Sequence, residues 1–314
     1  MDSAFECIVV GAGAAGLSGA LVLGRARRRT LVIDAGQQSN LATHGIGGLL
    51  GYDRRAPAEL YEQGLRELQA YPTVEFCRGR VMRGVALDDA LELQLEDGQI
   101  VRGLRVLLAT GMEYGAPELP GISQLWGTAV FQCPFCHGWE VRDRPLAALG
   151  SGEKGLHAAL LLRGWSEDVV LLTDGPTKLA DVDLERLAAA GVSVDERRVV
   201  ELIACDGELE AIAFASGDRL QRGGLLVAAP LRQRSELAEQ LGAASCGPNP
   251  VAVDPLCVDS LHRTTSPKVF AAGDVCTEMP QVGGAIAAGY RAAAMLVQSL
   301  LADEFGLPFP PNGS

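Results

Sequence analysis

The residues best suited to chemistry lie in one short stretch, Cys133-Pro134-Phe135-Cys136-His137. Two thiols separated by two residues can close a disulfide, and a helix that starts at the first thiol lowers its pKa and makes it a nucleophile. His137 could carry the proton that dithiol chemistry moves near neutral pH. A zinc site would need a second cysteine pair of this spacing or a compact histidine cluster, and the sequence has neither. We predict a redox-active dithiol and no metal site, with a purely structural disulfide as the alternative.

The other cysteines are too dispersed to suggest the disulfide framework of a small secreted protein. They are Cys7, Cys77, Cys205, Cys246, Cys257 and Cys276. The sequence therefore offers one closely spaced pair, Cys133 and Cys136, and we expect Cys276 to be a buried, inert thiol.

A glycine-rich motif, Gly11-Ala12-Gly13-Ala14-Ala15-Gly16, follows an apolar strand and opens an apolar helix, and Asp34 ends the next apolar strand. The glycines permit a tight turn and close backbone approach, the helix start meets a pyrophosphate, and the acid accepts ribose hydroxyls. Near the C-terminus, Gly273-Asp274 precedes a helix from about Gln281. An acid at Asp274 can bind a ribityl chain, so we predict FAD rather than NAD in this domain.

A second motif, Gly150-Ser151-Gly152-Glu153-Lys154-Gly155, has the same strand-and-helix context, so NAD(P)H is the expected ligand. Asp174, after the next strand, would suit an unphosphorylated ribose and so favours NADH over NADPH. Glu153 lies where the helix start should attract a phosphate, and residues 173–178 contain no arginine cluster for a 2′-phosphate. A Rossmann fold that no longer binds a nucleotide is the alternative. The candidate nucleotide-binding residues are Gly150, Gly152, Gly155 and Asp174.

The elements around the two motifs repeat one plan. Residues 7–36 and 146–175 each read as an apolar strand, a glycine-rich turn, an apolar helix and a second apolar strand, which is typical of parallel βαβ units. We predict an α/β fold of two nested Rossmann-like, doubly wound dinucleotide-binding domains, the second inserted in the first. The FAD-binding domain would comprise residues 1–113 and 232–314, and the central domain, which carries the dithiol, residues 114–231.

Composition narrows the class of partner. The 314 residues are 48% hydrophobic, with 27 Lys and Arg against 39 Asp and Glu, for a net charge of −12. This acidity argues against nucleic acid and against an anionic membrane surface. The longest apolar stretch, residues 282–301, contains Arg291, and the start of the chain is acidic where a secretory signal would be basic. We expect a cytoplasmic protein that is not bound to a membrane.

Two nested dinucleotide folds, with Cys133-x-x-Cys136 just before the second glycine motif, resemble the low-molecular-weight thioredoxin reductases over nearly the whole chain. The stretch Cys-Pro-Phe-Cys-His-Gly-Trp-Glu at residues 133–140 looks closest to the branch that includes the gliotoxin- and holomycin-type dithiol oxidases. The resemblance implies that Cys136 faces the flavin and that Cys133 attacks the substrate. It also implies a homodimer whose central domain swings between two poses. His137 stands where thioredoxin reductases have an acidic proton donor, and the arginine pair of NADPH-dependent members is missing.

Motif and resemblance together define the candidate site. The predicted catalytic residues are Cys133, Cys136 and His137. The predicted FAD-binding residues are Gly11, Ala12, Gly13, Ala14, Ala15, Gly16, Asp34, Ala35, Asn40, Val81, Ala109, Thr110, Gly111, Gly273, Asp274, Gln281 and Val282.

We therefore predict an FAD-dependent thiol–disulfide oxidoreductase that moves two electrons between flavin and thioredoxin or a small dithiol or disulfide. Three other interpretations stay open: an oxygen-dependent dithiol oxidase, a reductase fed by ferredoxin or another non-nicotinamide donor, and a redox-sensing flavoprotein without turnover.

Overall fold

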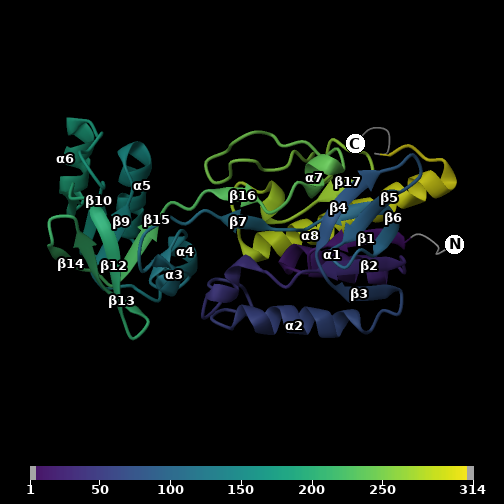
Figure 1. Cartoon of the computed structure of the whole chain (residues 1–314), viewed down its shortest axis with the longest axis horizontal. Coiled ribbons are helices and arrows are strands. Elements are labelled where there is room, and N and C mark those ends of the chain that lie inside the picture. The colour runs from purple at the N-terminus through teal and green to yellow at the C-terminus, as the bar shows by residue number, and fades with distance from the viewer. Residues whose placement is uncertain (1–4, 310–314) are drawn as a thin grey trace. The chain divides into compact units, whose positions relative to one another are not determined.

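The computed structural model describes residues 5–309 of the chain, so most of the acidic start of the sequence lies outside the described residues. The chain folds into two compact units (Figure 1). Unit 1 is formed by the described parts of Met1–Leu41, Ala58–Tyr114 and Leu231–Ser314. Unit 2 is formed by Ala42–Pro57 and Gly115–Pro230. The second unit is thus assembled from the long central segment and from one short segment, residues 42–57, contributed from the N-terminal third.

Unit 1 is built on a mainly parallel sheet with the strand order β3-β2-β1-β6-β5-β4, and β17 pairs with β6. Its strands are β1 (Phe5–Val10), β2 (Thr30–Asp34), β3 (Val74–Arg78), β4 (Val81–Ala86), β5 (Leu91–Leu95), β6 (Ile100–Leu108) and β17 (Val269–Ala271). A separate antiparallel pair joins β7 (Met112–Tyr114) to β16 (Leu231–Gln233). The helices are α1 (Ala14–Arg25), α2 (Pro57–Leu68), α7 (Leu237–Gln240) and α8 (Val282–Phe305), with short 3-10 turns at η1 (Ser39–Ala42) and η2 (Asp274–Cys276).

The parallel strands of unit 1 are apolar on both faces because both faces are covered. Ile8 and Ile33 belong to a core on one side of the sheet, whereas Val9 and Val32 belong to a core on the other. On the second side α1 packs against α8, and the contact is close because Gly19 and Gly289 bring the two backbones together. This packing places the start of α1 beside the carboxyl ends of β1, β6 and β17.

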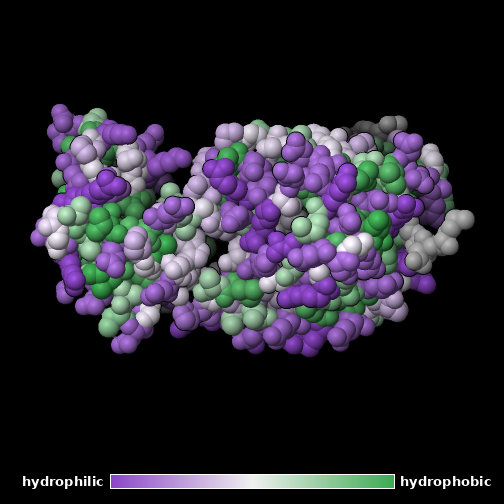
Figure 2. All heavy atoms as spheres, in the orientation of Figure 1, coloured by the Kyte–Doolittle hydropathy of each residue, from purple (hydrophilic) through white to green (hydrophobic). Residues whose placement is uncertain are grey.

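Helix α8 is long and apolar enough to cross a membrane by length and composition alone. A core helix of a soluble protein meets the same test, and the residues of α8 that face α1 and the sheet are buried. Arg291, which interrupts this apolar stretch in the sequence, lies within the helix. Figure 2 shows that hydrophilic residues cover most of the face of the molecule in view.

Unit 2 has a parallel sheet with the order β11-β10-β9-β15-β8 and a three-stranded antiparallel sheet, β12-β13-β14. The strands are β8 (Val130–Phe131), β9 (Leu146–Leu149), β10 (Val169–Leu172), β11 (Val192–Asp195), β12 (Val199–Cys205), β13 (Glu208–Phe214), β14 (Arg219–Gln221) and β15 (Gly224–Val227). The helices are α3 (Ile122–Leu125), α4 (Pro134–His137), α5 (Gly152–Leu162) and α6 (Asp181–Ala189). The predicted echo between residues 7–36 and 146–175 thus corresponds to β1-α1-β2 in unit 1 and β9-α5-β10 in unit 2.

Candidate functional site

The two thiols of the sequence motif are joined in the structure. Cys133 is the residue that caps the start of α4, Pro134 occupies the first helical position, and Cys136 lies in the single turn that follows. Proline suits that position because its fixed φ matches the helix and its missing N–H would have no partner there. The two Cα atoms are 5.3 Å apart, and a disulfide connects the sulfurs. Both cysteines are half-buried, so the pair retains access to solvent.

A loop that the sequence does not link to the dithiol packs directly against it. Gly47 lies so close to Cys136 that a side chain at this position would overlap the Cys136 carbonyl oxygen. The loop is closed by hydrogen bonds between Ile46 and Arg55, and from the Arg54 N–H to the Ile46 carbonyl at 2.7 Å. Only a glycine fits this approach, and the contact keeps residues 42–57 within unit 2.

His137 is held by the backbone of its own helix. Its Nδ1 lies 3.4 Å from the Cys133 carbonyl, and its ring stacks on Phe131 with centroids 5.8 Å apart. Burial lowers the pKa of His137 below its ordinary value, although the carbonyl of Cys133 acts in the opposite direction. The ring is therefore neutral at pH 7, and its buried Nε2 has no hydrogen-bond partner among the described residues.

Two aromatic side chains beside the dithiol are exposed to solvent. Phe135, between the two cysteines, is 60% exposed, and Trp139 is 57% exposed. The Phe135 ring meets Trp165 edge-on at 5.4 Å, and the guanidinium of Arg142 lies 3.9 Å from the Trp139 ring. The dithiol is thus flanked by apolar surface.

The first glycine loop has the geometry that a dinucleotide needs. A Cβ on Gly11 would overlap the Ala109 carbonyl oxygen, and a Cβ on Gly16 would overlap the Gly11 carbonyl oxygen. Gly13 is the N-cap residue of α1, and no side chain accepts a hydrogen bond from the first N–H groups of the helix. These N–H groups are therefore free to bind an anion in front of the loop. The predicted residues Ala12, Ala14 and Ala15 add no bulk there. This cradle fits a pyrophosphate.

Asp34 lies at the end of β2 and reaches back to the glycine loop. Its Oδ1 accepts a hydrogen bond from the Ala12 N–H at 2.9 Å and from Gln38 at 3.2 Å, while its Oδ2 pairs with Arg78 at 2.8 Å. The carboxylate is buried, whereas the Arg78 side chain is 63% exposed. Arg78 and Gln38 are the partners that ribose hydroxyls could replace, because the Ala12 bond can persist beside them.

The C-terminal turn meets the glycine loop from the other side. Gly273 has a φ of +85°, and a Cβ there would lie 2.9 Å from the Ala15 side chain. Asp274 follows it and accepts a hydrogen bond from the Tyr114 hydroxyl at 3.3 Å. Burial raises the pKa of Asp274, with Tyr114 opposing the shift. The turn thus presents one buried carboxyl beside the start of α1.

The other residues of the predicted FAD set also belong to unit 1, and several are engaged with the cradle. Asn40 accepts a hydrogen bond from the Tyr61 hydroxyl at 2.6 Å, and burial raises the pKa of Tyr61 to about 12. Gln281 caps α8. The remaining members are Ala35, after β2, Val81, at the start of β4, the turn Ala109, Thr110 and Gly111, after β6, and Val282, at the start of α8.

The second glycine loop repeats the first at the level of the backbone. A Cβ on Gly155 would lie 2.7 Å from the Gly150 carbonyl, and Gly152 begins α5 with a φ of +57°. Ser151 precedes the helix without capping it through its side chain, and Glu153 occupies the first turn. The backbone fits a phosphate, but the charge of Glu153 opposes one.

The strand register places Thr173, not Asp174, opposite this second loop. Ile33 pairs with Val10 in unit 1, and Leu172 pairs with Leu149 in unit 2, so Thr173 holds the position that Asp34 holds in unit 1. Thr173 is buried, and its hydroxyl donates to the Gly175 carbonyl at 2.6 Å.

Asp174 is directed elsewhere. Its carboxylate accepts a hydrogen bond from the Val199 N–H at 2.8 Å, and its backbone is left-handed with a φ of +53°. The predicted ribose acid thus joins β12 to the end of β10 instead of facing the second glycine loop.

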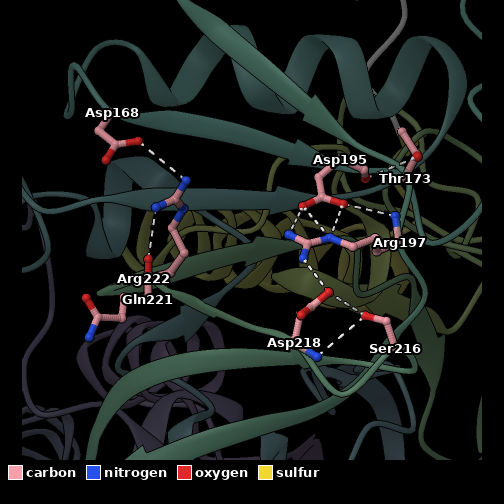
Figure 3. Close-up of polar contacts among 8 residues, drawn as sticks. All are labelled: Asp168, Thr173, Asp195, Arg197, Ser216, Asp218, Gln221 and Arg222. Atoms are coloured by element: carbon pink, nitrogen blue, oxygen red, sulfur yellow. Dashed lines mark hydrogen bonds and ion pairs between the residues drawn. The ribbon is translucent and has the colours of Figure 1, made fainter.

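An ion-pair network lies at the same edge of unit 2 (Figure 3). Arg197 forms a fork with Asp195, at 2.5 Å for the shortest contact, and also reaches Asp218 at 3.3 Å. The bond from Arg197 lowers the pKa of Asp195. Arg222 pairs with Asp168 at 3.5 Å on the other side of the network. Arg197 is thus committed to two carboxylates of the chain itself and does not replace the arginine cluster that a 2′-phosphate would require.

Comparison with known proteins agrees with this geometry. Residues 5–289 match the family model described as pyridine nucleotide-disulphide oxidoreductase. The chain is 32% identical to thioredoxin reductase tcpT of Claviceps purpurea (strain 20.1), over 96% of each chain. The crystal structure of HlmI has a TM-score of 0.89 and 34% identity, and the match covers 98% of this chain and 95% of that one. An oxidoreductase from Agrobacterium tumefaciens has the same TM-score at 31% identity, over 95% and 99% of the two chains.

Fold and site define a disulfide oxidoreductase built on two dinucleotide folds. The chain belongs to the pyridine nucleotide-disulphide oxidoreductase family, and within it the chain is an oxidoreductase of the thioredoxin-reductase type. The predicted α/β fold, the family resemblance and the assignment as a thiol–disulfide oxidoreductase are confirmed. The family as a whole is one of flavin and nicotinamide cofactors.

Proposed function

We propose that this chain holds FAD in unit 1 and uses Cys133 and Cys136 to exchange an electron pair with a substrate disulfide or dithiol. The observation that carries the proposal is the Cys133–Cys136 disulfide at the start of α4, half-buried and reachable from solvent. Bound FAD would supply the two-electron chemistry that renews the pair after each turnover. Unit 1 supports this assignment because its glycine loop, Asp34 and Asp274 offer a cradle of the right chemistry.

In the reducing direction, the Cys133 thiolate attacks one sulfur of the substrate disulfide, forms a mixed disulfide and releases the first substrate thiolate. The Cys136 thiolate then attacks the Cys133 sulfur, re-forms the Cys133–Cys136 disulfide and releases the second substrate thiolate. Two electrons pass from the pair to the substrate, and the released thiolates take up the two protons that the pair gave up. The oxidation of a dithiol is the same sequence in reverse.

His137 supports this chemistry by moving one of those protons. Because its ring is neutral near pH 7, it can accept a proton from a thiol and return it to a leaving thiolate. The supporting observation is the ring's fixed place on α4, one residue after Cys136 and within 3.4 Å of the Cys133 carbonyl.

The substrate we propose is thioredoxin or a small dithiol or disulfide, and the exposed Phe135 and Trp139 favour partners with apolar surface near their sulfurs. We also propose that the enzyme is a homodimer and works in the cytoplasm, without nucleic acid or membrane partners. NAD(P)H is the family's usual electron donor, and Gly150, Gly152 and Gly155 keep the backbone loop for it. Thr173 stands at the position equivalent to Asp34, so the ribose of that donor would meet a hydroxyl there and not a carboxylate.

The test is an anaerobic titration of the purified, FAD-loaded protein with NADPH and with NADH, followed by the flavin spectrum. Prompt bleaching by either nucleotide supports the nucleotide-driven reductase. No bleaching, combined with oxygen uptake on addition of a dithiol, would instead identify a dithiol oxidase. Bleaching by a reduced ferredoxin alone would identify a non-nicotinamide reductase.

The matched variant is Cys133→Ser. We expect it to bind FAD as the wild type does and to lose turnover with every dithiol or disulfide tested, whereas Cys205→Ser, at an exposed free cysteine of unit 2, should turn over normally. If wild type and Cys133→Ser are equally inert with all substrates while both hold FAD, the chain is a redox-sensing flavoprotein and the proposed enzyme function is wrong.

A further inference from the structure

A second cysteine pair is joined in unit 1, whereas the first pair belongs to unit 2. Cys246 and Cys257 have Cα atoms 4.9 Å apart and form a disulfide across two extended segments of unit 1. The segments are paired in an antiparallel manner at Ser245 and Leu256. The Cys246 N–H donates to the Pro255 carbonyl, and the Cys257 N–H donates to the Ala244 carbonyl, each at 2.9 Å. The bond therefore closes the base of a loop, residues 246–257.

One sulfur of this pair is accessible. Cys246 is exposed and Cys257 is half-buried, whereas the next residue inward, Leu256, is buried in the core of unit 1. Thiol–disulfide exchange begins with attack on an accessible sulfur. A thiol from solvent would therefore attack the sulfur of Cys246. Exposed disulfides of this kind are the labile ones, and in a reducing compartment such disulfides are regulatory or catalytic more often than structural.

The loop is connected to the turn that carries Asp274. The Leu256 N–H, next to Cys257, donates to the Val275 carbonyl at 2.8 Å. The side-chain amide of Gln233 donates to the same carbonyl at 3.3 Å and to the Asp254 carbonyl at 3.1 Å. Val275 directly follows Asp274, so these hydrogen bonds connect the segment between Asp254 and Cys257 to the Asp274 turn.

We propose that Cys246 and Cys257 are a second thiol–disulfide site, opened by small dithiols and closed by small disulfides, and that its state sets how firmly the Asp274 turn holds FAD. This inference rests on the proposed binding of FAD by Asp274. With the disulfide closed, the Leu256–Val275 bond is anchored on both sides of Leu256. With the disulfide open, the strand end at Cys257 is held by backbone hydrogen bonds alone, and the turn loses part of its support.

The opening step is balanced by the dithiol. One thiolate of a small dithiol attacks the Cys246 sulfur, forms a mixed disulfide and frees the Cys257 thiolate. The second thiolate of the same molecule then attacks its own sulfur in the mixed disulfide and frees the Cys246 thiolate. Two electrons and two protons pass to the protein, and the dithiol leaves as a cyclic disulfide. A glutathione disulfide reverses the change and leaves as two molecules of glutathione.

The test uses the full-length, FAD-loaded protein with Cys133→Ser and Cys136→Ser, so that only the second pair can form a disulfide by this route. The protein is treated with dithiothreitol without oxygen, freed of reagent, and divided between alkylation and a measurement of FAD release. Cys246 and Cys257 lie on one tryptic peptide, residues 235–263, which carries two alkyl groups only if the pair has opened.

We expect two alkyl groups on that peptide and an FAD dissociation rate about five-fold higher or more, within the usual range for coupled sites. Glutathione disulfide should restore slow release, and a variant that also carries Cys246→Ser and Cys257→Ser should release FAD fast in either buffer. Cys205→Ser in the same background is the control, with slow release before treatment. Because the treated and untreated samples have the same sequence, the comparison between them does not depend on how well the Cys246→Ser, Cys257→Ser variant folds.

The inference is overturned if the peptide stays unalkylated until the protein unfolds, or if it is fully alkylated while FAD release is unchanged. Failure to hold FAD in either state would overturn both this inference and the proposed function, whereas tight FAD binding that ignores the second pair would overturn only the inference.

Discussion

The two glycine loops of the chain are nearly the same backbone with different surroundings. In each, the sixth residue of the motif approaches the first so closely that only glycine fits, Gly16 on Gly11 and Gly155 on Gly150. In unit 1 the strand that follows supplies a buried carboxylate, Asp34, to the loop. In unit 2 the corresponding position is Thr173, and its hydroxyl bonds to its own turn.

This difference separates the part of a dinucleotide site that packs the fold from the part that recognises the ligand. The close approach of the glycines packs a helix on a strand in both units, so it persists whether or not a nucleotide binds there. The acid at the end of the second strand has a different part in unit 1, because its carboxylate accepts a hydrogen bond from the loop and is the group proposed to bind ribose. The glycine motif alone therefore identifies the fold, whereas the residue at the strand end identifies the ligand.

Among the substitutions that test this difference between the two loops, we expect Gly16→Ala to cause the largest loss of FAD affinity. The new methyl group would overlap the Gly11 carbonyl oxygen and push the loop open, at a cost of about 1–3 kcal/mol. If that cost falls on the ligand-bound form, FAD affinity drops roughly 5- to 150-fold, as measured by equilibrium dialysis. Gly155→Ala also brings a Cβ too close to the first glycine of its motif, 2.7 Å from the Gly150 carbonyl, but in unit 2, and it should leave FAD affinity unchanged.

Gly79→Ala is the matched control in unit 1, since its Cβ would meet the Leu95 side chain at 3.5 Å and the Cys77 sulfur at 3.9 Å, both ordinary contact distances. Equal loss of FAD in Gly155→Ala and Gly16→Ala would contradict the assignment of flavin to unit 1.

We expect the next largest loss of FAD affinity from substitution of Asp34. Asp34→Ala removes the acceptor for the Ala12 N–H and the group proposed to bind ribose, and a hydrogen bond to a charged group contributes about 1.5–3 kcal/mol. We expect FAD to bind at least about ten-fold more weakly, measured by fluorescence titration. Asp34→Asn keeps an acceptor for Ala12 and should lose less. An unchanged affinity in Asp34→Ala would show that the ribose lies elsewhere.

Unit 2 differs from unit 1 in carrying the dithiol. Because His137 is proposed to move a proton for that dithiol, we expect it to govern the pH dependence of turnover. Burial lowers the pKa of His137 below its ordinary 6.5, so the ring is neutral at pH 7 and becomes protonated only in more acidic solution. Wild-type turnover of a dithiol should therefore fall as the pH drops below 6.5, because the charged ring cannot accept a proton.

His137→Gln should turn over about 100-fold more slowly at pH 7 and should lack this acidic limb. His262→Gln is the control, because burial lowers the pKa of His262 as well, but this histidine belongs to unit 1 and not to the unit that carries the dithiol. A limb that persists unchanged in His137→Gln would remove the histidine from the mechanism.

The smallest effect is expected from Asp174→Ala. The change removes one hydrogen bond, to the Val199 N–H, and should lower the free energy of unfolding by about 1 kcal/mol in a denaturant titration. NADH affinity, measured by calorimetry, should stay as it is in the wild type. A large loss of NADH binding would show that Asp174, despite its place in the register, acts as the ribose acid.

Sequence reasoning succeeded where the determining contacts are local. The spacing of Cys133 and Cys136 and the two glycine loops depend on residues within six positions of each other, and each motif predicts its own turn. The position of Asp174 was harder, because one residue of strand register decides whether a side chain faces the loop or points away from it. Only the pairing of Leu172 with Leu149 reveals that Thr173 takes that place.

Long-range contacts could not be predicted at all. Nothing in residues 42–57 indicates that Gly47 packs on Cys136, since the contact joins segments about ninety positions apart. The Cys246–Cys257 bond was missed because ten ordinary residues separate the two cysteines, and only the antiparallel pairing at Ser245 and Leu256 brings them together. The one signal available was that both cysteines flank a proline-rich stretch, which is typical of a tight loop.

The central claim is that the sulfur pair of unit 2 exchanges electrons with FAD held by unit 1. It is tested most directly by mixing the FAD-loaded protein with dithiothreitol in the absence of oxygen and following the loss of flavin colour, in the wild type and in Cys136→Ser. We expect rapid bleaching of the wild type and a variant that stays yellow although it holds the same amount of FAD. Bleaching at the same rate in both proteins, or a wild type that stays yellow with its Cys133–Cys136 pair fully reduced, would contradict the claim.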